Sequence, residues 1–266
     1  MEKSQIPLQK WLVAIYILTS HKKGISSVQL ANDIGVTQKS AWFMAHRIRE
    51  AFKNKKRSSL KGIVELDETY MGRKYRSEYK GLPPELAAEM EKNRKDKGSS
   101  TKGAVVALKE REGDVVAKVF DRRTAQVIKN LVKQYVEKGT TLMTDEALLY
   151  RKVLKEYKRF SVNHGKGEWV RGNVHNNGVE NFWSVMKRAI YGIYHQVSYK
   201  HLQRYCDEFV FRFNRRKVSN KIKFDASLSN INGRLTYKEL TKNKKSSNFP
   251  SLNEARKRWL KENRGY

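Results

Sequence analysis

The sequence has one cysteine, Cys206, and therefore lacks the thiols for a disulfide framework or for a cysteine-based zinc site. Its six histidines are scattered along the chain, which disfavours a zinc site built from imidazoles alone. No apolar run approaches the ~18 residues of a membrane span, and no signal-peptide pattern opens the chain. These absences predict a cytoplasmic protein that makes no contact with a membrane.

Acidic residues are scarce relative to basic ones. The chain has 27 Asp and Glu against 56 Lys and Arg, which leaves a formal net charge of +29. The electrostatic field of such a net charge attracts polyanions and accelerates encounter with them in a salt-dependent way. Ribosome-associated and membrane-surface proteins share such an excess of basic residues. The charge therefore predicts a polyanionic partner, for which DNA is the simplest candidate, but it does not indicate an activity.

The chain is long enough for one large domain, or for a large and a small one, and its 39% of hydrophobic residues can form a core. A basic, polar segment, "NKKRSS" at 54–59, is a plausible boundary. We predict a helical DNA-binding domain over residues 1–58, an α/β catalytic domain over 59–220 and a basic tail over 221–266. Residues 73–102 are charged and contain Gly, Ser and Pro, which predicts an insertion with a short helix at "PELAAEMEKN".

The first ~55 residues have helical periodicity. Residues 24–52 predict a helix, a tight turn and a second helix, with caps at Ser26 or Ser27 and at Thr37, and with Gly35 in the turn. This resembles a helix-turn-helix, whose second helix enters the major groove of DNA. The inward side chains of that helix are predicted to be Ala41, Met44, Ala45, Ile48 and Phe52, which leaves Gln38, Lys39, Ser40, Arg47 and Arg49 for solvent or DNA. A three-helix cap that contacts only protein is the alternative.

The rest of the chain predicts a ribonuclease-H-like α/β fold. A strand in "LKGIVELDETYMG" is followed by a hairpin of residues 103–109 and 114–120 and by an amphipathic helix at 124–136. A short strand then leads into Asp145 and a helix, and a further strand, "RFSVNH", precedes a helix that contains Glu180. A long helix, "YKHLQRYCDEFVFRFNRR", follows.

Three carboxylates occupy informative positions in this order: Asp67 on the first strand, Asp145 just past the fourth, and Glu180 on a later helix. Phosphodiester cleavage places negative charge on the attacking and leaving oxygens, and two Mg²⁺ or Mn²⁺ ions neutralise both. Such cations prefer carboxylate and phosphate oxygens. The triplet on a basic chain therefore predicts metal-dependent phosphoryl transfer on nucleic acid.

Each of these residues has a simpler explanation. Asp67 lies between Glu65 and Glu68, so the cluster could be a solvated strand end. Asp145 and its neighbour could be first-turn acids that complement a helix dipole. Glu180 could belong to a capping box that Asn177 begins. The three explanations are independent of one another, whereas one metal site accounts for all three residues.

Two more side chains near Glu180 draw attention. Lys187 follows it by seven residues, or two helical turns, so both side chains share a face; an exposed helix lysine is the alternative. His175 precedes Glu180 by five residues and could position a phosphate or a water molecule. Phe182, Trp183, Met186 and Ile190 have the spacing of the buried stripe of this helix.

The motifs "ELDETYMG", "TLMTDEALLY", "GRLTYKEL" and the long block from Ser161 to Arg216 resemble the insertion-sequence transposases of family fifteen-ninety-five, the ISXO-type DDE transposases. The similarity covers about residues 5–240. The resemblance implies that Asp67, Asp145 and Glu180 are the catalytic metal ligands for two Mg²⁺ or Mn²⁺ ions. It also implies DNA contacts at the element end from Lys187, Arg188 and the "H-x-N-x-x-E" residues His175 and Asn177.

The implied chemistry is hydrolytic nicking at the element end, followed by attack of the freed 3′-hydroxyl on target DNA. The implied partners are double-stranded DNA and further copies of the chain, in a homodimer or higher oligomer on the prokaryotic nucleoid. Many relatives carry a cysteine-rich zinc ribbon before the helix-turn-helix, and this sequence has none. Two alternatives remain: a repressor that binds element ends without cutting them, and a ribonuclease-H-type nuclease or resolvase.

Overall fold

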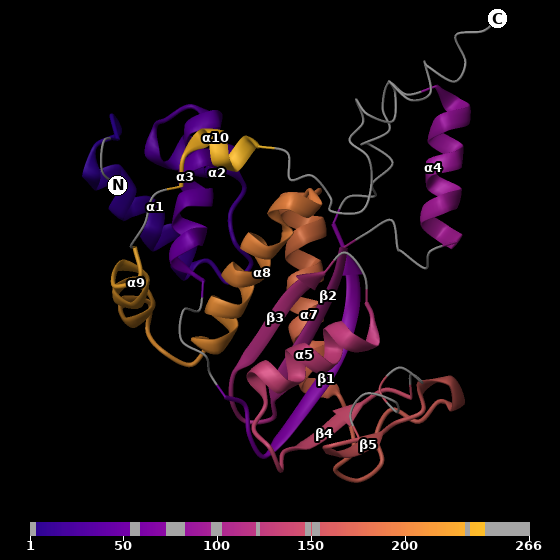
Figure 1. Ribbon diagram of the computed structural model, residues 1–266. Coiled ribbons are helices and arrows are strands. Elements are labelled where there is room, and N and C mark those ends of the chain that lie inside the picture. The colour runs from indigo at the N-terminus through magenta and orange to yellow at the C-terminus, as the bar shows by residue number, and fades with distance from the viewer. Residues whose placement is uncertain are drawn as a thin grey trace, which may run out of the picture.

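The computed structural model describes residues 4–53, 59–72, 83–96, 103–120, 123–146, 150, 155–231 and 235–242. These residues form a mixed sheet with helices on both faces and a body of helices beside it (Figure 1). The predicted α/β class is therefore confirmed. Among the described residues, no helix combines the length and the apolar composition that crossing a membrane requires.

The described part of the sheet has five strands in the order β3-β2-β1-β4-β5. The central strand β1 pairs antiparallel with β2 and parallel with β4. Of the outer pairs, β2–β3 is antiparallel and β4–β5 is parallel. Each strand expected from the sequence is present. Their bounds are β1 Ile63–Met71, β2 Gly103–Glu110, β3 Val115–Phe120, β4 Thr141–Thr144 and β5 Lys158–Ser161.

Helices cover both faces of this sheet (Figure 1). On one face α5 (Ala125–Tyr135), capped by Thr124, packs Ile128 and Val132 against alternate residues of β1 and β2. On the other face α7 (Asn177–Ala189) and α8 (Tyr199–Asn214) pack against the remaining residues of the same strands. Side chains alternate along a strand, so strands that are covered on both faces need apolar residues at successive positions, as β2 has.

The N-terminal helices are α1 (Leu8–Ser20), α2 (Ser27–Ile34) and α3 (Gln38–Ala51). Ser26 and Thr37 cap α2 and α3, and Gly35 ends α2 at a φ of 60°, which a residue with a side chain rarely adopts. The helix bounds and caps predicted from the sequence are confirmed. So are the inward residues of α3: Ala41, Met44, Ala45, Ile48 and Phe52 are all buried.

Residues 221–242 of the segment predicted as a basic tail contain two helices, α9 (Asn220–Leu228) and α10 (Tyr237–Thr241). Phe224, Ala226, Leu228 and Ile231 pack against the core of the N-terminal helices. Tyr237 of α10 makes an edge contact with Phe43 of α3, with ring centroids 5.8 Å apart. The later part of the predicted tail, residues 243–266, lies outside the described residues.

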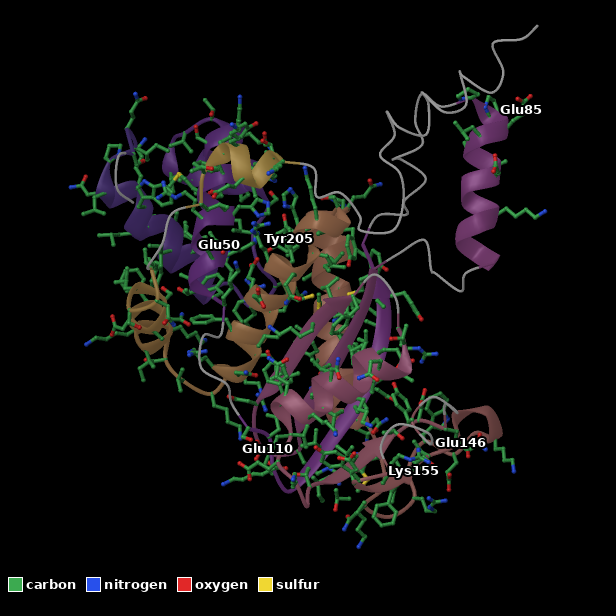
Figure 2. The ribbon with its side chains drawn as sticks, viewed as in Figure 1. Glu50, Glu85, Glu110, Glu146, Lys155 and Tyr205 are labelled. Atoms are coloured by element: carbon green, nitrogen blue, oxygen red, sulfur yellow. The ribbon has the colours of Figure 1, made fainter. Side chains whose placement is uncertain are left out.

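Arg49 corrects one prediction made for α3. It was expected to face solvent or DNA, but its side chain is 2% exposed and its Nε donates to Oε2 of Glu208 in α8 at 2.6 Å. The reason is helical spacing: Arg49 follows Ala41 and Ala45 at intervals of four and lies on the buried side that faces α8. Tyr205 lies under the guanidinium at the same junction, which Figure 2 marks with Tyr205 and Glu50.

The insertion expected over residues 73–102 includes α4 (Pro84–Asp96), which lies apart from the sheet in Figure 1. The helix expected after Asp145 falls mostly on residues 147–149 and 151–154, outside the described residues. Between β5 and α7 the chain has a 3₁₀ turn at His164–Lys166, and α7 continues into a π-helical turn, η3 (Ile190–Tyr194).

Candidate functional site

Two of the predicted acidic residues stand at equivalent positions along neighbouring parallel strands, Asp67 in the middle of β1 and Asp145 just past the end of β4. The register of β1 on β4 pairs Glu65 with Met143. Asp67 and Asp145 each follow these partners by two residues, on β1 and directly after β4. Residues in register on adjacent parallel strands lie side by side, so the fold brings together two residues that are 78 positions apart in sequence.

Asp67 faces the α7 side of the sheet and is half-buried. Its Oδ2 accepts a hydrogen bond of 3.0 Å from the indole Nε1 of Trp183. Burial, followed by the charges of Asp145 and Glu180, raises the pKa of Asp67 to about 6, against the lowering effect of its hydrogen bonds to Trp183 and to the backbone of Glu68. The two other carboxylates therefore lie within electrostatic reach of Asp67.

Glu180 stands in the first turn of α7 and is half-buried. The capping-box alternative does not describe it, because α7 begins at Asn177 and the residue in the N-cap position, Asn176, makes no side-chain capping bond. Within the described residues, no three carboxylate, imidazole or thiol groups already form a ligand set for one ion. The three acidic residues are therefore neighbours, but their side chains are not already arranged around the position of a single metal ion.

The donor chemistry nevertheless suits a hard divalent cation. Asp67, Asp145 and Glu180 offer only carboxylate oxygens, which are the ligands that Mg²⁺ and Mn²⁺ prefer. The raised pKa of Asp67 reports, after burial, the repulsion among these charges, and a cation between them would relieve that repulsion.

Glu65 is a neighbour of the site that the sequence analysis treated only as part of an acidic cluster. It lies on β1 two residues before Asp67 and is 1% exposed. Its Oε2 accepts from the backbone N–H of Val179 at 2.8 Å, and its Oε1 accepts from Nε of Arg111 at 3.2 Å. Its position between the apolar residues Val64 and Leu66 was the available signal, since a buried carboxylate requires partners.

His175 lies beside this pair. Its Nδ1 is 3.7 Å from Oε1 of Glu65, and its backbone carbonyl accepts from Nη2 of Arg111 at 3.0 Å. Asn177, Lys187 and Arg188 are exposed on α7, and Nε of Arg188 donates to the carbonyl of Ser184 at 3.3 Å.

Further polar side chains surround the carboxylates. Nη1 of Arg159 on β5 donates to Oγ1 of Thr144 at 2.8 Å, which supports the backbone immediately before Asp145. Glu68 points to the opposite face of β1 from Asp67 and contacts Tyr150 and Arg123. Burial and the charges of Asp145 and Asp67 raise the pKa of Glu68. The sequence analysis missed Arg159, which has no acidic neighbour in sequence to mark it.

The residues predicted to contact DNA from the N-terminal domain stand at the start of α3. Gln38 and Lys39 are exposed and Ser40 is half-buried. Nε2 of Gln38 donates to Oγ of Ser27 at 2.9 Å, and Nζ of Lys39 lies 5.2 Å from the ring centroid of Tyr237. Helix α10 therefore borders the outer face of α3, beside the first turn of that helix.

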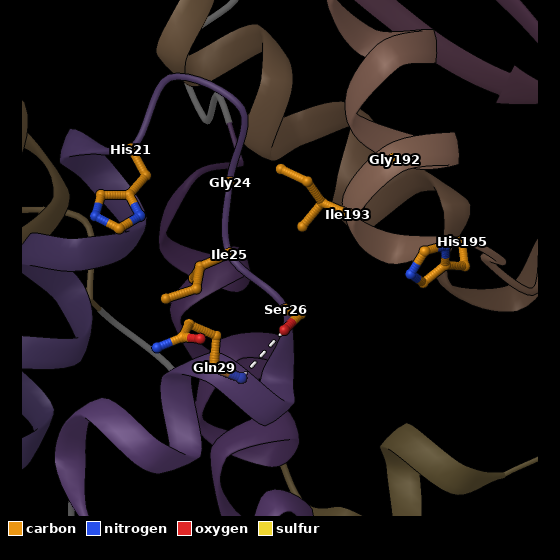
Figure 3. A pocket seen from close by; sticks show the side chains of 8 residues that line it. All are labelled: His21, Gly24, Ile25, Ser26, Gln29, Gly192, Ile193 and His195. Carbon is orange, nitrogen blue, oxygen red and sulfur yellow. Dashed lines mark hydrogen bonds between the residues drawn. The ribbon is translucent and has the colours of Figure 1, made fainter.

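A pocket of about 370 Å³ lies between the loop that joins α1 to α2, the first turn of α2, and η3 (Figure 3). Oγ of Ser26 in its wall accepts from the backbone N–H of Gln29 at 3.1 Å, so the start of α2 is capped within the protein. The pocket is separate from the acidic site, because its lining contains none of the three carboxylates: His21, Gly24, Ile25, Ser26, Gln29, Gly192, Ile193 and His195.

The fold and the site together define an α/β protein with an acidic site on the neighbouring parallel strands β1 and β4 and the first turn of α7. A family model described as the ISXO2-like transposase domain matches residues 59–214 of this chain. The chain therefore belongs to the ISXO2-like transposase family, which confirms the resemblance noted from its motifs.

A curated relative in Halobacterium salinarum is described as an uncharacterized protein in transposable element ISH50. It is 28% identical to this chain over 199 residues. The match covers 70% of this chain and 63% of the relative, so the chain spans less than two thirds of the length of that relative.

Proposed function

We propose that this transposase cleaves DNA strands at the ends of an insertion sequence and joins the freed 3′-hydroxyl to target DNA, with Asp67, Asp145 and Glu180 as the catalytic metal ligands. The observation that carries the proposal is the grouping of these three carboxylates, where burial and then the charges of Asp145 and Glu180 raise the pKa of Asp67. Membership of a transposase family supports the DNA substrate.

The strand order supports assigning residues 59–220 to a ribonuclease-H-like catalytic domain. An antiparallel β3-β2-β1 unit continues through parallel β4 and β5, with helices on both faces. In this arrangement the first and fourth strands are neighbours, and carboxylates at their ends face a helix that crosses the same edge.

When bound, two Mg²⁺ or Mn²⁺ ions would neutralise the attacking and leaving oxygens of the phosphodiester and lower the pKa of the attacking water or hydroxyl. Asp67, Asp145 and Glu180 would hold them through carboxylate oxygens. The Trp183 indole fixes the rotation of the Asp67 carboxylate by its hydrogen bond to Oδ2. In the first step water attacks phosphorus and the 3′-oxygen leaves; in the second that 3′-hydroxyl attacks a target phosphodiester and displaces a target 3′-oxygen.

We assign DNA binding to two surfaces. Lys187 and Arg188 are exposed cations on the helix that carries Glu180, and they would contact phosphates at the element end. Residues 1–58 would act as a helix-turn-helix domain, with Gln38, Lys39 and Ser40 at the start of α3 facing the major groove. His175 and Asn177 flank the start of α7 and complete the proposed DNA contacts. Two DNA ends would require at least a homodimer.

A nicking and joining assay tests the proposal. We expect Glu180→Gln to bind element-end DNA as the wild type does and to lose nicking by more than about a hundredfold, because it removes a metal ligand and not merely an outer partner. Asp67→Asn and Asp145→Asn should behave alike. Glu146→Gln is the matched control, since it neutralises an exposed carboxylate next to Asp145 and should nick normally.

The same assay separates the alternatives. A repressor would bind end DNA and leave it uncut in Mg²⁺ or Mn²⁺. A nuclease or resolvase on this fold would cut RNA–DNA hybrids or junctions without producing joined strands. Normal cutting by Glu180→Gln would remove Glu180 from the catalytic set.

A further inference from the structure

Glu65 is a buried charge that the proposed chemistry does not use. It sits at 1% exposure on the central strand, in the same file of side chains as Asp67. Burying a carboxylate is costly unless hydrogen bonds and an opposite charge compensate it. Its partners come from two other parts of the chain, the start of α7 and the turn between β2 and β3.

The first partner is the N-terminus of α7. The first N–H groups of a helix have no acceptor within the helix, and an N-cap side chain normally accepts from the second or third of them. Asn176 occupies the N-cap position of α7 without making that bond. Oε2 of Glu65 accepts instead from Val179, the third residue of the helix, at 2.8 Å. A strand residue thus does what an N-cap does, with a full negative charge at the positive end of the helix.

The second partner is Arg111. While its Nε donates to Oε1 of Glu65, its Nη1 donates to the carbonyl of Asn173 at 2.8 Å and its Nη2 to that of His175 at 3.0 Å. The guanidinium therefore ties the segment before α7 to β1. Lys109 holds the turn that carries Arg111, because its Nζ donates to the carbonyls of Arg111 and Gly113 at 3.0 and 3.1 Å.

The third observation is the glycine at the second position of α7. A Cβ atom on Gly178 would lie 2.7 Å from Oε2 of Glu65. Glycine is a poor helix former, but here it permits the carboxylate to approach the helix backbone. The contact requires both the carboxylate of Glu65 and the absence of a side chain at Gly178. This pair of residues therefore sets the distance between the start of α7 and the sheet.

We infer that Glu65 is a positioning residue that caps α7 from the neighbouring strand and, together with Arg111, fixes Glu180 opposite Asp67 and Asp145. Glu180 directly follows Val179, and Asp67 lies two residues from Glu65. The hydrogen bond between Glu65 and Val179 therefore joins β1 to α7 close to Asp67 on the strand and to Glu180 on the helix. This inference rests on the proposed function, because it takes Glu180 as a metal ligand.

Two measurements that do not require strand cleavage test it. Hydrogen exchange of metal-free protein should show the amides at the start of α7 exchanging at least about fivefold faster in Glu65→Ala, as expected for the loss of an N-cap. Electron paramagnetic resonance titration of the protein–DNA complex should show Mn²⁺ bound about 10- to 100-fold more weakly, the usual effect of removing a partner that orients a ligand.

The conservative variant separates capping from charge. Glu65→Gln keeps an acceptor for Val179 but loses the charge facing Arg111, so its exchange should stay near that of the wild type while Mn²⁺ binds with intermediate affinity. Gly178→Ala should weaken Mn²⁺ binding despite the better helix propensity of alanine. Combining it with Glu65→Ala should cause no further loss, because the obstructing carboxylate is gone.

Val132→Ala is the control for general destabilisation, since Val132 is fully buried on α5 at the opposite face of the sheet. It should lower the melting temperature and leave both readouts unchanged. Wild-type exchange and Mn²⁺ affinity in Glu65→Ala, or changes equal to those of Val132→Ala, would overturn the inference. Absence of nicking by the wild type would overturn only the proposed function, because neither readout depends on it.

Discussion

At the scale of single residues, Asp67 couples the site to pH. Its pKa is raised from 3.8 to about 6, first by burial and then by Asp145 and Glu180. A raised carboxyl pKa favours the protonated folded state, so this contribution to stability is complete below the unfolded value and is lost as pH rises through about 6. We therefore expect this term to lower the melting temperature of metal-free protein between about pH 4 and pH 6, and Mg²⁺ to restore much of the loss.

Thermal melting with EDTA and with Mg²⁺ over this pH range measures the effect. Asp67→Asn should flatten both the pH dependence and the response to Mg²⁺, because the amide neither ionises nor repels its neighbours. Asp33→Asn, on the exposed surface of α2, is the control and should behave as the wild type does. Identical curves for Asp67→Asn and the wild type would contradict the assignment of this titration to Asp67.

The sequence could single out Asp67 and Glu180, because each interrupts an apolar pattern at a place where the predicted fold has an edge. It could not assign Glu65, whose partners Arg111 and Val179 lie 46 and 114 residues away and meet it only in the folded chain. For Arg49 the spacing from Ala41 and Ala45 indicated the buried side of α3, but its acceptor Glu208 is 159 residues distant and could not be assigned from the sequence.

At the scale of elements, the junction of α3 with α8 depends on Glu208. This carboxylate is fully buried, accepts from Nε of Arg49 and from the hydroxyl of Tyr194 at 2.6 and 2.8 Å, and contacts Arg212. Burial raises its pKa, but Arg212 and Arg49 outweigh burial and hold the pKa at about 2. The N-terminal helices are therefore attached to α8 through a charge that has no access to water.

We expect Glu208→Ala to lower the free energy of unfolding by about 3–5 kcal/mol, because it leaves two arginines buried without their partner. Urea denaturation measures the change. Glu50→Ala is the control, since Glu50 pairs with Lys53 and Arg204 at a more exposed position and should cost no more than about 1 kcal/mol. Equal losses in the two variants would show that the junction does not depend on the buried charge.

Most elements were predictable because their ends carry local signals, such as the caps of α2, α3 and α5 and the turn of the β2–β3 hairpin.

The packing of α9 could not be predicted from the sequence. Its apolar residues Ile222, Phe224, Ala226 and Leu228 alternate at intervals of two, which indicates no helical face, and Ile222 is 53% exposed. Contact with α1 and its cluster of apolar residues helps to cover the other three, which are half-buried.

At the scale of the whole molecule, the net charge of +29 predicts DNA affinity that falls steeply with salt. Each phosphate contact contributes about 0.9 to the slope of log affinity against log salt. We expect Lys187→Ala to reduce that slope by about 0.9 on element-end DNA, measured by fluorescence anisotropy between about 50 and 200 mM salt. Lys138→Ala should leave the slope unchanged, because this exposed lysine precedes β4 and so lies at the opposite sheet edge from Asp145.

The packing of α9 against the N-terminal helices has a consequence for biosynthesis. Residues 4–53 leave the ribosome before α9 does, yet the apolar surface that receives Phe224 and Leu228 stays uncovered until α9 has been translated. The helices proposed to bind DNA therefore complete their packing only after the strands next to Asp67 and Asp145 have been translated. A nascent polypeptide arrested before α9 would contain the three proposed metal ligands but would lack a completed form of the proposed DNA-binding domain.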